Sequence, residues 1–296
     1  MNSNGESGNK EEFPSGEESY SRISQEVFGG IKDLISDSSG LDIGNYKDKC
    51  IMRRIAVRVR ARKCGSDEEY LEILKQEEEE KKALLKALTI NVTQFFRNLE
   101  VFEKIREVVL PVIFENKAGD EHREVRIWSA GCSSGEEPYS MAIILAEYFK
   151  KDMARCPVYI LATDFDHEVI AKGREGVYNE KSLLDAPSEL VEKYFTKLDG
   201  GMFKIDDGIR KMVSFKRRNI FELGTHIGQD LIICRNMLIY FSRDQQQQIL
   251  MSLAESLNDG GFLVLGKAET LISESRSLFK SVSTRERIYR KINFNC

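Results

Sequence analysis

The spacing of apolar residues divides the chain into a helical first part and an α/β second part. From residue 21 to residue 90, apolar side chains recur every three or four positions, as Val27 and Ile31 do. This period predicts amphipathic helices packed against one another, and the first of them is expected to end near Gly40. The charged run 77–82 lies among the last leucines of this part and is interpreted as a solvated helix face.

After Asn98, helical periodicity alternates with short runs rich in Val, Ile and Leu. A helix is expected from residue 99 to about Pro111, because proline interrupts helices by removing a backbone donor. The apolar runs predict buried strands at residues 125–128, 158–164, 230–234 and 260–266. Further helices are predicted at 138–151, 168–174 and 243–257, and a final strand pair between 278 and 292. Strands that alternate with helices are typical of a doubly wound α/β sheet.

The alternation breaks between about residues 180 and 215. Here Met202–Ile205 and Met212–Phe215 alternate like strands on either side of Asp206–Gly208, a turn-like sequence. These features predict an inserted β-hairpin subdomain whose second arm leads back into the main sheet. The predicted organisation is a disordered acidic tail (1–20), a helical N-terminal domain (21–90) and an α/β domain with the insert (91–296).

Composition and charge narrow the function classes. The chain of 296 residues is 41% hydrophobic and 31% charged, which is typical of a soluble globular protein. Its net charge of −4 indicates no general affinity for nucleic acid or for membranes. No apolar run is long enough to span a bilayer, and the polar N-terminus has no signal peptide. The six cysteines form no C-x-x-C pair, which disfavours a zinc site and a disulfide framework. We therefore expect a cytoplasmic protein without a bound metal.

One predicted helix departs from this acidic balance. In residues 46–63, which we call the arginine helix, Met52, Ile55, Ala56 and Val59 gather on one side. Five arginines flank this apolar stripe: Arg53, Arg54, Arg58, Arg60 and Arg62. Such a concentration of positive charge favours docking of an acidic partner, and the alternative is a solvated helix face.

The most informative stretch is residues 125–139, a strand, a small-residue turn and the start of a helix. Gly131 and Gly135 in the turn would let the backbone approach a ligand, so Gly131 is a predicted cofactor contact. The helix begins with Glu136 and Glu137, which would repel a phosphate. A ligand with hydroxyls, an ammonium or a sulfonium fits better, and S-adenosylmethionine (SAM) has all three. The alternative is a surface turn whose acids complement the helix dipole.

Other polar residues follow or accompany the later strands. Asp164 ends the second strand, where an acid hydrogen-bonds ribose hydroxyls in nucleotide folds. Asn219 and Ile220 lie beside a strand, and Arg235 and Asn236 follow another. Because ligands bind at the carboxyl edge of such sheets, these groups are predicted to surround one ligand.

The chain resembles the CheR-type chemotaxis receptor methyltransferases, which transfer a methyl group from SAM to glutamate side chains of chemoreceptors. The motifs that carry the resemblance are Thr89–Arg97, Ser129–Tyr139, Ala162–Asp164 and Cys234–Phe241, within a match over roughly residues 22–292. Cys132 in the glycine turn is a mild variation. The resemblance implies a Rossmann-like SAM methyltransferase domain with an inserted small antiparallel β-subdomain, preceded by an all-helical domain.

The resemblance also implies roles for individual residues. SAM would be held by Asn91, Thr93, Arg97, Glu136, Asp164, Asn219, Ile220, Arg235 and Asn236. Arg97 and Tyr240 are the family's candidates beside the reacting carboxylate, and the product of SAM is S-adenosylhomocysteine. The arginine helix would face the cytoplasmic domain of a chemoreceptor. In some members the β-insert binds a short tether at the receptor C-terminus.

The residue inventory agrees with this chemistry. A glutamate side chain, with a pKa near ~4.3, is already ionised at neutral pH, so its methylation needs no general base. The three histidines (122, 167 and 226) accordingly lie outside every motif. An RNA or small-molecule methyltransferase is one alternative, disfavoured by the acidic balance and by the lack of Pro-Pro-Tyr/Phe after strand 230–234. A SAM-sensing module without activity is another, and it would be expected to have lost Arg97 or Tyr240.

Overall fold

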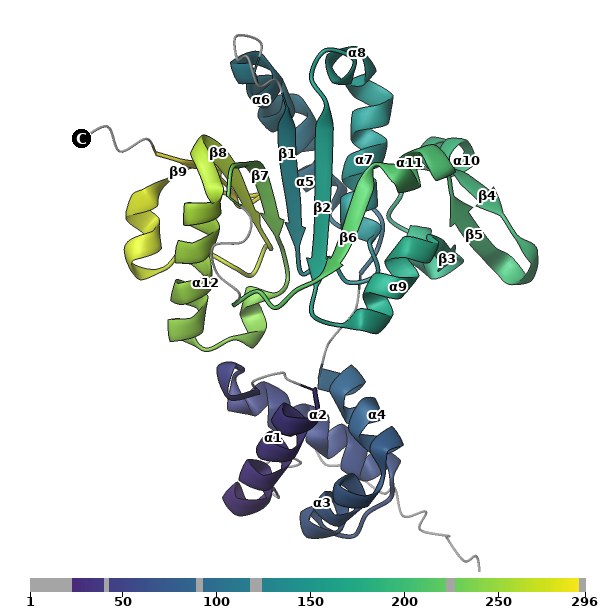
Figure 1. Cartoon of the computed structure of the whole chain (residues 1–296), viewed down its shortest axis with the longest axis vertical. Coiled ribbons are helices and arrows are strands. Elements are labelled where there is room, and N and C mark those ends of the chain that lie inside the picture. The colour runs from purple at the N-terminus through teal and green to yellow at the C-terminus, as the bar shows by residue number, and fades with distance from the viewer. Residues whose placement is uncertain (1–22, 40–42, 89–92, 118–123, 222–226, 293–296) are drawn as a thin grey trace, which may run out of the picture. The chain divides into compact units, whose positions relative to one another are not determined.

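The computed structural model of the chain describes residues 23–39, 43–88, 93–117, 124–221 and 227–292 (Figure 1). The chain forms two compact units, residues 1–90 and residues 91–296, and each is considered by itself below. The expected disordered tail, residues 1–20, lies outside the described residues. Among the described helices, none combines the length and the apolar character that crossing a membrane requires.

The first unit is a bundle of amphipathic helices. Its helices are α1 (Gln25–Ser39), α2 (Asp48–Ala61), α3 (Asp67–Gln76) and α4 (Glu78–Leu88), with a short 3₁₀ turn at Ile43–Asn45. Each buries its apolar stripe, as Ile31 of α1 and Leu84 of α4 illustrate. Local chemistry sets the boundaries: the Ser66 side chain accepts the Glu69 N–H and caps α3.

The second unit is built around a seven-stranded sheet, which confirms the predicted doubly wound α/β fold. In spatial order the strands are β6 (Val213–Arg217), β2 (Val158–Asp164), β1 (Val125–Ala130), β7 (Gln229–Cys234), β8 (Leu257–Leu265), β10 (Ile288–Lys291) and β9 (Phe279–Ser283). The first five are parallel, and β10 is antiparallel to both of its neighbours. The chain runs outward from β1 through β2 to β6 and then returns to β7. The strand order therefore reverses between β1 and β7, which is where such sheets bind ligands.

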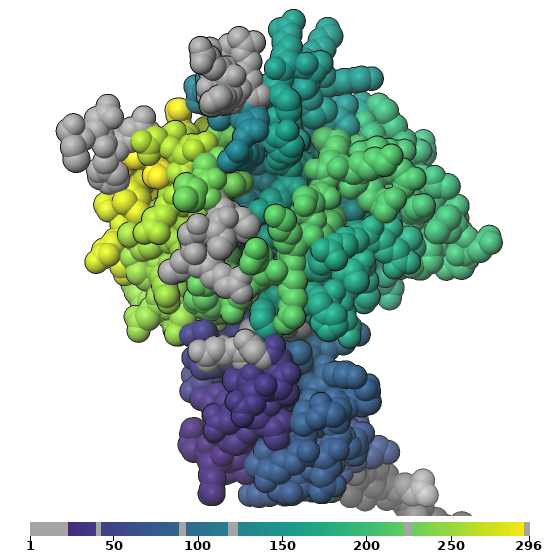
Figure 2. Space-filling model, in the orientation of Figure 1, coloured from purple at the N-terminus to yellow at the C-terminus, as the bar shows by residue number. Residues whose placement is uncertain are grey.

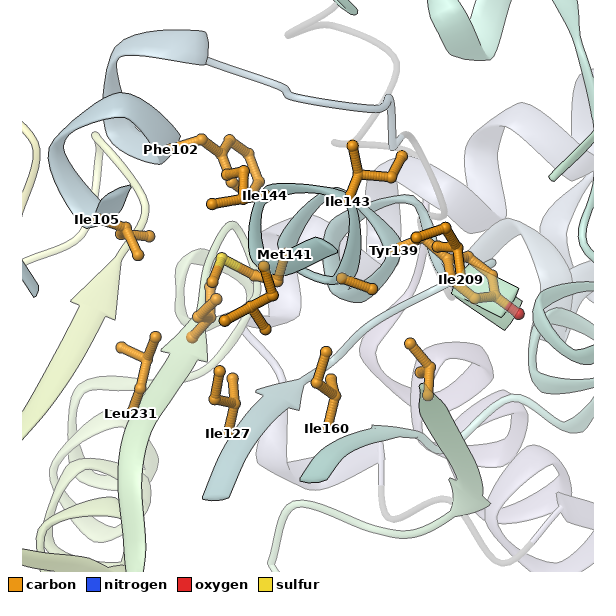
Figure 3. Close-up of a cluster of buried hydrophobic side chains, with 14 of the residues drawn as sticks. Phe102, Ile105, Ile127, Tyr139, Met141, Ile143, Ile144, Ile160, Ile209 and Leu231 are labelled. Carbon is orange, nitrogen blue, oxygen red and sulfur yellow. The ribbon is translucent and has the colours of Figure 1, made fainter. Parts of the chain in front are cut away.

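Helices cover this sheet, and α7 (Glu136–Tyr148) is the central one. Ile127, Ile160 and Leu231 point from three adjacent strands toward α7 (Figure 3). The other helices are α5 (Leu99–Lys104), α6 (Leu110–Lys117), α8 (Lys150–Met153), α9 (His167–Glu175) and α12 (Arg243–Ser256), with 3₁₀ turns at Leu238–Tyr240 (η5) and Ser273–Leu278. Because most of α7 is buried, its N-terminus is fixed at the carboxyl end of β1.

The helix expected to end near Pro111 instead continues to Lys117. Between α5 and α6 the chain forms a π-helical turn, η2 (Ile105–Val109), in which the Leu110 N–H bonds the Ile105 carbonyl. Proline normally clashes with the carbonyl four residues earlier. Pro111 directly follows this wider π turn, at the second position of α6.

The insert is a separate three-stranded antiparallel sheet in the order β3-β5-β4, as predicted in kind but not in pairing. Its strands are β3 (Val177–Asn179), β4 (Phe195–Lys197) and β5 (Met202–Ile205), accompanied by the helices η3 (Glu180–Leu183), α10 (Ser188–Tyr194), η4 (Asp199–Gly201) and α11 (Asp207–Lys211). The predicted pairing between β5 and the following strand is wrong, because β5 pairs with β3 and β4. The predicted return of the second arm to the main sheet is confirmed, because β6 pairs with β2. Asp206 explains the error: its side chain accepts the Gly208 and Ile209 N–H groups and starts α11 instead of a turn.

Candidate active site

The glycine turn lies at the carboxyl end of β1, beside the loop that follows β7. Gly131 has φ +75°, and a Cβ there would lie 2.8 Å from the Met237 sulfur. Gly135 has φ +95°, and a Cβ there would lie 2.7 Å from the ring of Phe215. Only glycine combines these backbone conformations with such close neighbours. The two loops at the switch point are therefore packed against each other through this turn.

Glu136 and Asp164 hold the glycine turn from two sides. Glu136 is the first residue of α7 and is 2% exposed; it accepts the Ser134 hydroxyl at 2.8 Å. Asp164 accepts the Ser133 N–H at 2.9 Å and the Asp166 N–H at 3.0 Å. Burial raises the pKa of both carboxyl groups. A carboxylate offers about four acceptor positions, so Asp164 retains capacity for ligand hydroxyls.

Residues 93–98 form a strained loop against the start of α7. Phe96 has φ +55° and Asn98 has φ +62°, both unusual for residues with a side chain. The Phe96 N–H donates to the Ser140 hydroxyl, and the Phe95 N–H donates to the Ser182 carbonyl of the insert. The surrounding contacts thus impose the loop conformation that carries Arg97.

Arg235 lies beneath this loop. Its Nη2 donates to the Arg97 carbonyl at 2.9 Å and to Asn98 Oδ1 at 2.8 Å. Its Nη1 is 3.5 Å from a carboxylate oxygen of Glu137, which in turn accepts the Ser129 hydroxyl. Burial lowers the pKa of the Arg235 guanidinium, and the charge of Glu137 opposes that effect. The loop after β7 is thereby fastened to the loop that carries Arg97.

Comparison with known proteins agrees with this geometry. The family model "CheR methyltransferase, SAM binding domain" matches residues 91–288, and "CheR methyltransferase, all-alpha domain" matches residues 26–89. The chain belongs to the CheR methyltransferase family. A "Chemotaxis protein methyltransferase" of Borreliella burgdorferi is 30% identical over 84% of this chain and 89% of the relative. The "Chemotaxis protein methyltransferase 2" of Vibrio cholerae is 32% identical over 87% and 89%. The chain also shows a partial similarity to a solved structure, PKMT2 from Rickettsia typhi in complex with AdoHcy. The match covers 48% of this chain and 20% of that one, with 18% identity and a TM-score of 0.30.

The CheR family uses SAM, and the groups at the switch point fit this cofactor. Among the described residues, Ser133 Oγ and Arg235 Nε are buried without a hydrogen-bond partner. Buried polar atoms of this kind need a partner, and SAM carries hydroxyls, an amino group and a carboxylate. Glu136 and Asp164 add acceptors that suit its positive charge and its ribose. The donor set at the carboxyl edge therefore matches the family's cofactor.

The other predicted SAM residues lie on or near this edge. Asn219 and Ile220 follow β6 and are half-buried, and Asn219 Oδ1 accepts the Phe221 N–H. Thr93 is half-buried at the start of the strained loop, whereas Asn91 lies outside the described residues. Tyr240 is half-buried in η5.

Several residues that shape the CheR site escaped the sequence prediction. Glu137 carries the ion pair with Arg235, and the Tyr178 hydroxyl donates to the Ser134 carbonyl at 2.8 Å. Glu269 accepts backbone N–H groups from the loop that carries Asn236. Asp164 is predicted because it is an acidic residue at the end of a predicted strand. The same criterion applied after strand 260–266 would have identified Glu269.

In the all-alpha domain, the arginine helix is α2, and two of its arginines have internal partners. Arg58 donates two hydrogen bonds, at 2.9 and 2.7 Å, to the buried carboxylate of Glu80. Arg62 bonds Glu77 at 2.8 Å. The buried face is formed by Ile51, Ile55 and Ala56, while the predicted stripe members Met52 and Val59 are only half-buried. Arg53 and Arg60 are exposed, and Arg54 is half-buried.

Proposed function

We propose that this protein transfers the methyl group of SAM to glutamate carboxylates in the cytoplasmic domain of a chemoreceptor. The products would be glutamyl methyl esters, used in chemotaxis adaptation, and S-adenosylhomocysteine. The observation that carries the proposal is the link through Arg235 between the Arg97 loop and the loop that leads to Tyr240. This link supports the proposal that Arg97 and Tyr240, the family's candidates beside the reacting carboxylate, lie together at the carboxyl edge of the sheet. The names of the relatives support the receptor substrate, and an enzyme that acts on the cytoplasmic domain of a receptor would work in the cytoplasm.

The residues of this site suit an acceptor that is already an anion. SAM supplies a methyl group that is electrophilic because it is bound to a positively charged sulfur. Arg97 attracts and orients the glutamate carboxylate, and the Tyr240 hydroxyl holds one of its oxygens. A carboxylate needs no base at neutral pH, so alignment of the reactants supplies most of the acceleration.

We assign receptor docking to the exposed side of α2. Arg58 and Arg62 are engaged with Glu80 and Glu77, so Arg53, Arg54 and Arg60 are the arginines we assign to an acidic receptor surface. Exposed charges of this kind increase the association rate and are screened by salt. The alternative is that this face of α2 is only solvated.

A receptor tether, if one is recognised, would add to an edge of the insert. The space-filling view shows the insert, coloured green, forming one side of the second unit (Figure 2). Its strand β5 (Met202–Ile205) is central and paired on both sides, so it offers no free edge. The edges are β3 and β4, and Thr196 and Lys197 of β4 are exposed. An extended peptide can add to such an edge as a further strand. The alternative is that the insert only covers the main sheet.

The direct test incubates the protein with methyl-labelled SAM and receptor cytoplasmic domains. The expected product is a protein-bound label that alkali releases, because methyl esters of carboxylates are hydrolysed by base. Tyr240→Phe is the matched variant: it removes one hydroxyl, and it should slow labelling while SAM binding persists. Label on RNA or on a small molecule, or SAM binding without any transfer to a receptor, would overturn the proposal.

A further inference from the structure

Glu269 is a buried carboxylate that joins two loops at the switch point. It lies in the loop after β8 and is 4% exposed. Its Oε2 accepts the Gly266 N–H at 2.7 Å and the Asn236 N–H at 3.0 Å, and its Oε1 accepts the Ile239 N–H at 3.3 Å. The first donor belongs to its own loop and the other two belong to the loop after β7.

These bonds fix both ends of a short turn. Asn236, at the first end, has φ +59°, a left-handed conformation that few residues with a side chain adopt. Ile239, at the other end, belongs to η5, the 3₁₀ turn that contains Tyr240. Each carboxylate oxygen therefore holds a different end: Oε2 holds the residue assigned to SAM, and Oε1 holds the turn that carries the hydroxyl assigned to the acceptor.

A carboxylate at this place is more than a packing residue. Burial raises the pKa of Glu269, while the backbone N–H donors oppose that effect. A buried carboxyl group is unfavourable unless its oxygens are satisfied. The two oxygens of Glu269 accept three N–H groups from two loops. An apolar side chain has no acceptor, and an amide has only one acceptor oxygen, so neither can replace the carboxylate.

We propose that Glu269 is a positioning residue for methyl transfer. One of its carboxylate oxygens positions Asn236 next to SAM, and the other positions Tyr240 next to the methyl acceptor. This rests on the function proposed above. Glu269 touches neither reactant; it acts through the turn 236–240.

Two variants separate the two halves of the proposal. In Glu269→Gln, one oxygen remains to accept the Gly266 and Asn236 N–H groups. The new amide then faces the Ile239 N–H, donor against donor, so the Tyr240 end moves. In Gly266→Ala, the added Cβ would lie 2.7 Å from Glu269 Oε2 and 2.8 Å from the Asn236 nitrogen, so the Asn236 end moves.

Strand β7, which leads into the turn 236–240, offers a control. Asp230 lies at the amino end of β7, is also buried, and accepts the Arg126 N–H at 2.9 Å and the Asn258 side-chain amide at 2.8 Å. It also pairs with Lys117 at 3.0 Å. Asp230→Asn likewise removes a buried, hydrogen-bonded carboxylate, but at the end of β7 that faces away from the site.

The experiment measures melting temperature, SAM affinity by calorimetry, and kcat for receptor methylation in the full chain. Glu269→Gln should lower kcat roughly 10- to 100-fold, the effect of one lost buried hydrogen bond, and should change SAM affinity much less. Gly266→Ala should weaken SAM binding roughly tenfold or more. Asp230→Asn should lower the melting temperature and leave both functional quantities unchanged.

The proposal is overturned if folded Glu269→Gln and Gly266→Ala both behave like Asp230→Asn, with a lower melting temperature and unchanged kcat and SAM affinity. If Glu269→Gln does not fold, Gly266→Ala decides the matter through SAM affinity alone. If the wild-type protein methylates no receptor, the proposed function fails. The Asn236 half of the inference is then still decided by calorimetry, which needs no methyl acceptor.

Discussion

Replacement of Arg58 by methionine should unfold the helical domain at a much lower temperature without affecting the catalytic domain. Arg58 makes two charge-assisted hydrogen bonds to Glu80, which is 3% exposed. Methionine keeps the aliphatic stem and removes the charge, so Glu80 retains only the Tyr70 hydroxyl at 2.8 Å and Arg62 at 3.8 Å. The variant therefore leaves a buried carboxylate short of its main partner.

The structure sets the size of this effect. Removal of one partner from a fully buried ion pair costs about 3–5 kcal/mol. The Arg58 side chain is 25% exposed, and two partners of Glu80 remain, so we expect roughly 2–3 kcal/mol. In a domain of this size, that corresponds to a fall in melting temperature of about 10–20 °C.

The assay uses the full chain and two probes. The single tryptophan, Trp128, lies in β1, so its fluorescence reports unfolding of the second unit. Far-UV circular dichroism reports the helices of both units. Arg58→Met should move part of the circular dichroism transition to lower temperature and leave the temperature of the Trp128 fluorescence transition unchanged. Arg54→Met, on the same helix, is the control and should change stability by less than about 0.5 kcal/mol. Equal unfolding curves for the two variants would refute the structural role of the Arg58–Glu80 pair.

Three further predictions concern pH, the cofactor and the partner. Burial alone would raise the pKa of Glu80, but hydrogen bonds from Arg58 and Tyr70 lower it below its usual value. The stability that Glu80 contributes is therefore complete above about pH 4.3 and is lost as the pH falls through the lowered pKa, so acid titrations of wild type and Glu80→Gln should converge at low pH. Asp164→Asn should weaken SAM binding by roughly 1–3 kcal/mol by calorimetry, and an unchanged affinity in a folded variant would remove the ribose assignment. Reversal of Arg53 and Arg60 to Glu should slow receptor methylation and flatten its dependence on salt, whereas Lys75→Glu should do neither; equal rates at every ionic strength would mean that α2 is only solvated.

The elements and their order could be predicted because each leaves a periodic trace in its own residues. Apolar runs locate β1, β2, β7 and β8, and the small residues at Gly131 and Gly135 mark the turn at the sheet edge. The edge of the sheet at which Asp164 and Asn236 both lie then follows from the parallel topology. Local sequence thus predicts the frame on which the proposed SAM site lies.

Partners distant in sequence could not be predicted in the same way. The Arg58–Glu80 pair spans 22 residues, and Arg235 reaches the Arg97 carbonyl across 138 residues. A charged side chain that bonds a backbone group leaves no pattern, because the backbone is the same at every residue. Asp206 shows a local ambiguity instead: aspartate before glycine favours a turn and also caps helices, and only the paths of β5 and β6 decide between them.

The contacts of Tyr178 and Ser182 determine how the insert can be exchanged between enzymes. Tyr178 bonds the Ser134 carbonyl, and the Ser182 carbonyl accepts the Phe95 N–H, so the first residues of the insert support the catalytic scaffold. A chimera made to transfer receptor preference should therefore begin its foreign segment after Leu183. The retained β3 would still pair with a foreign β5, because that pairing uses backbone groups. A graft that begins at Val177 would remove both supports at once, and its loss of activity would be mistaken for a change in receptor preference.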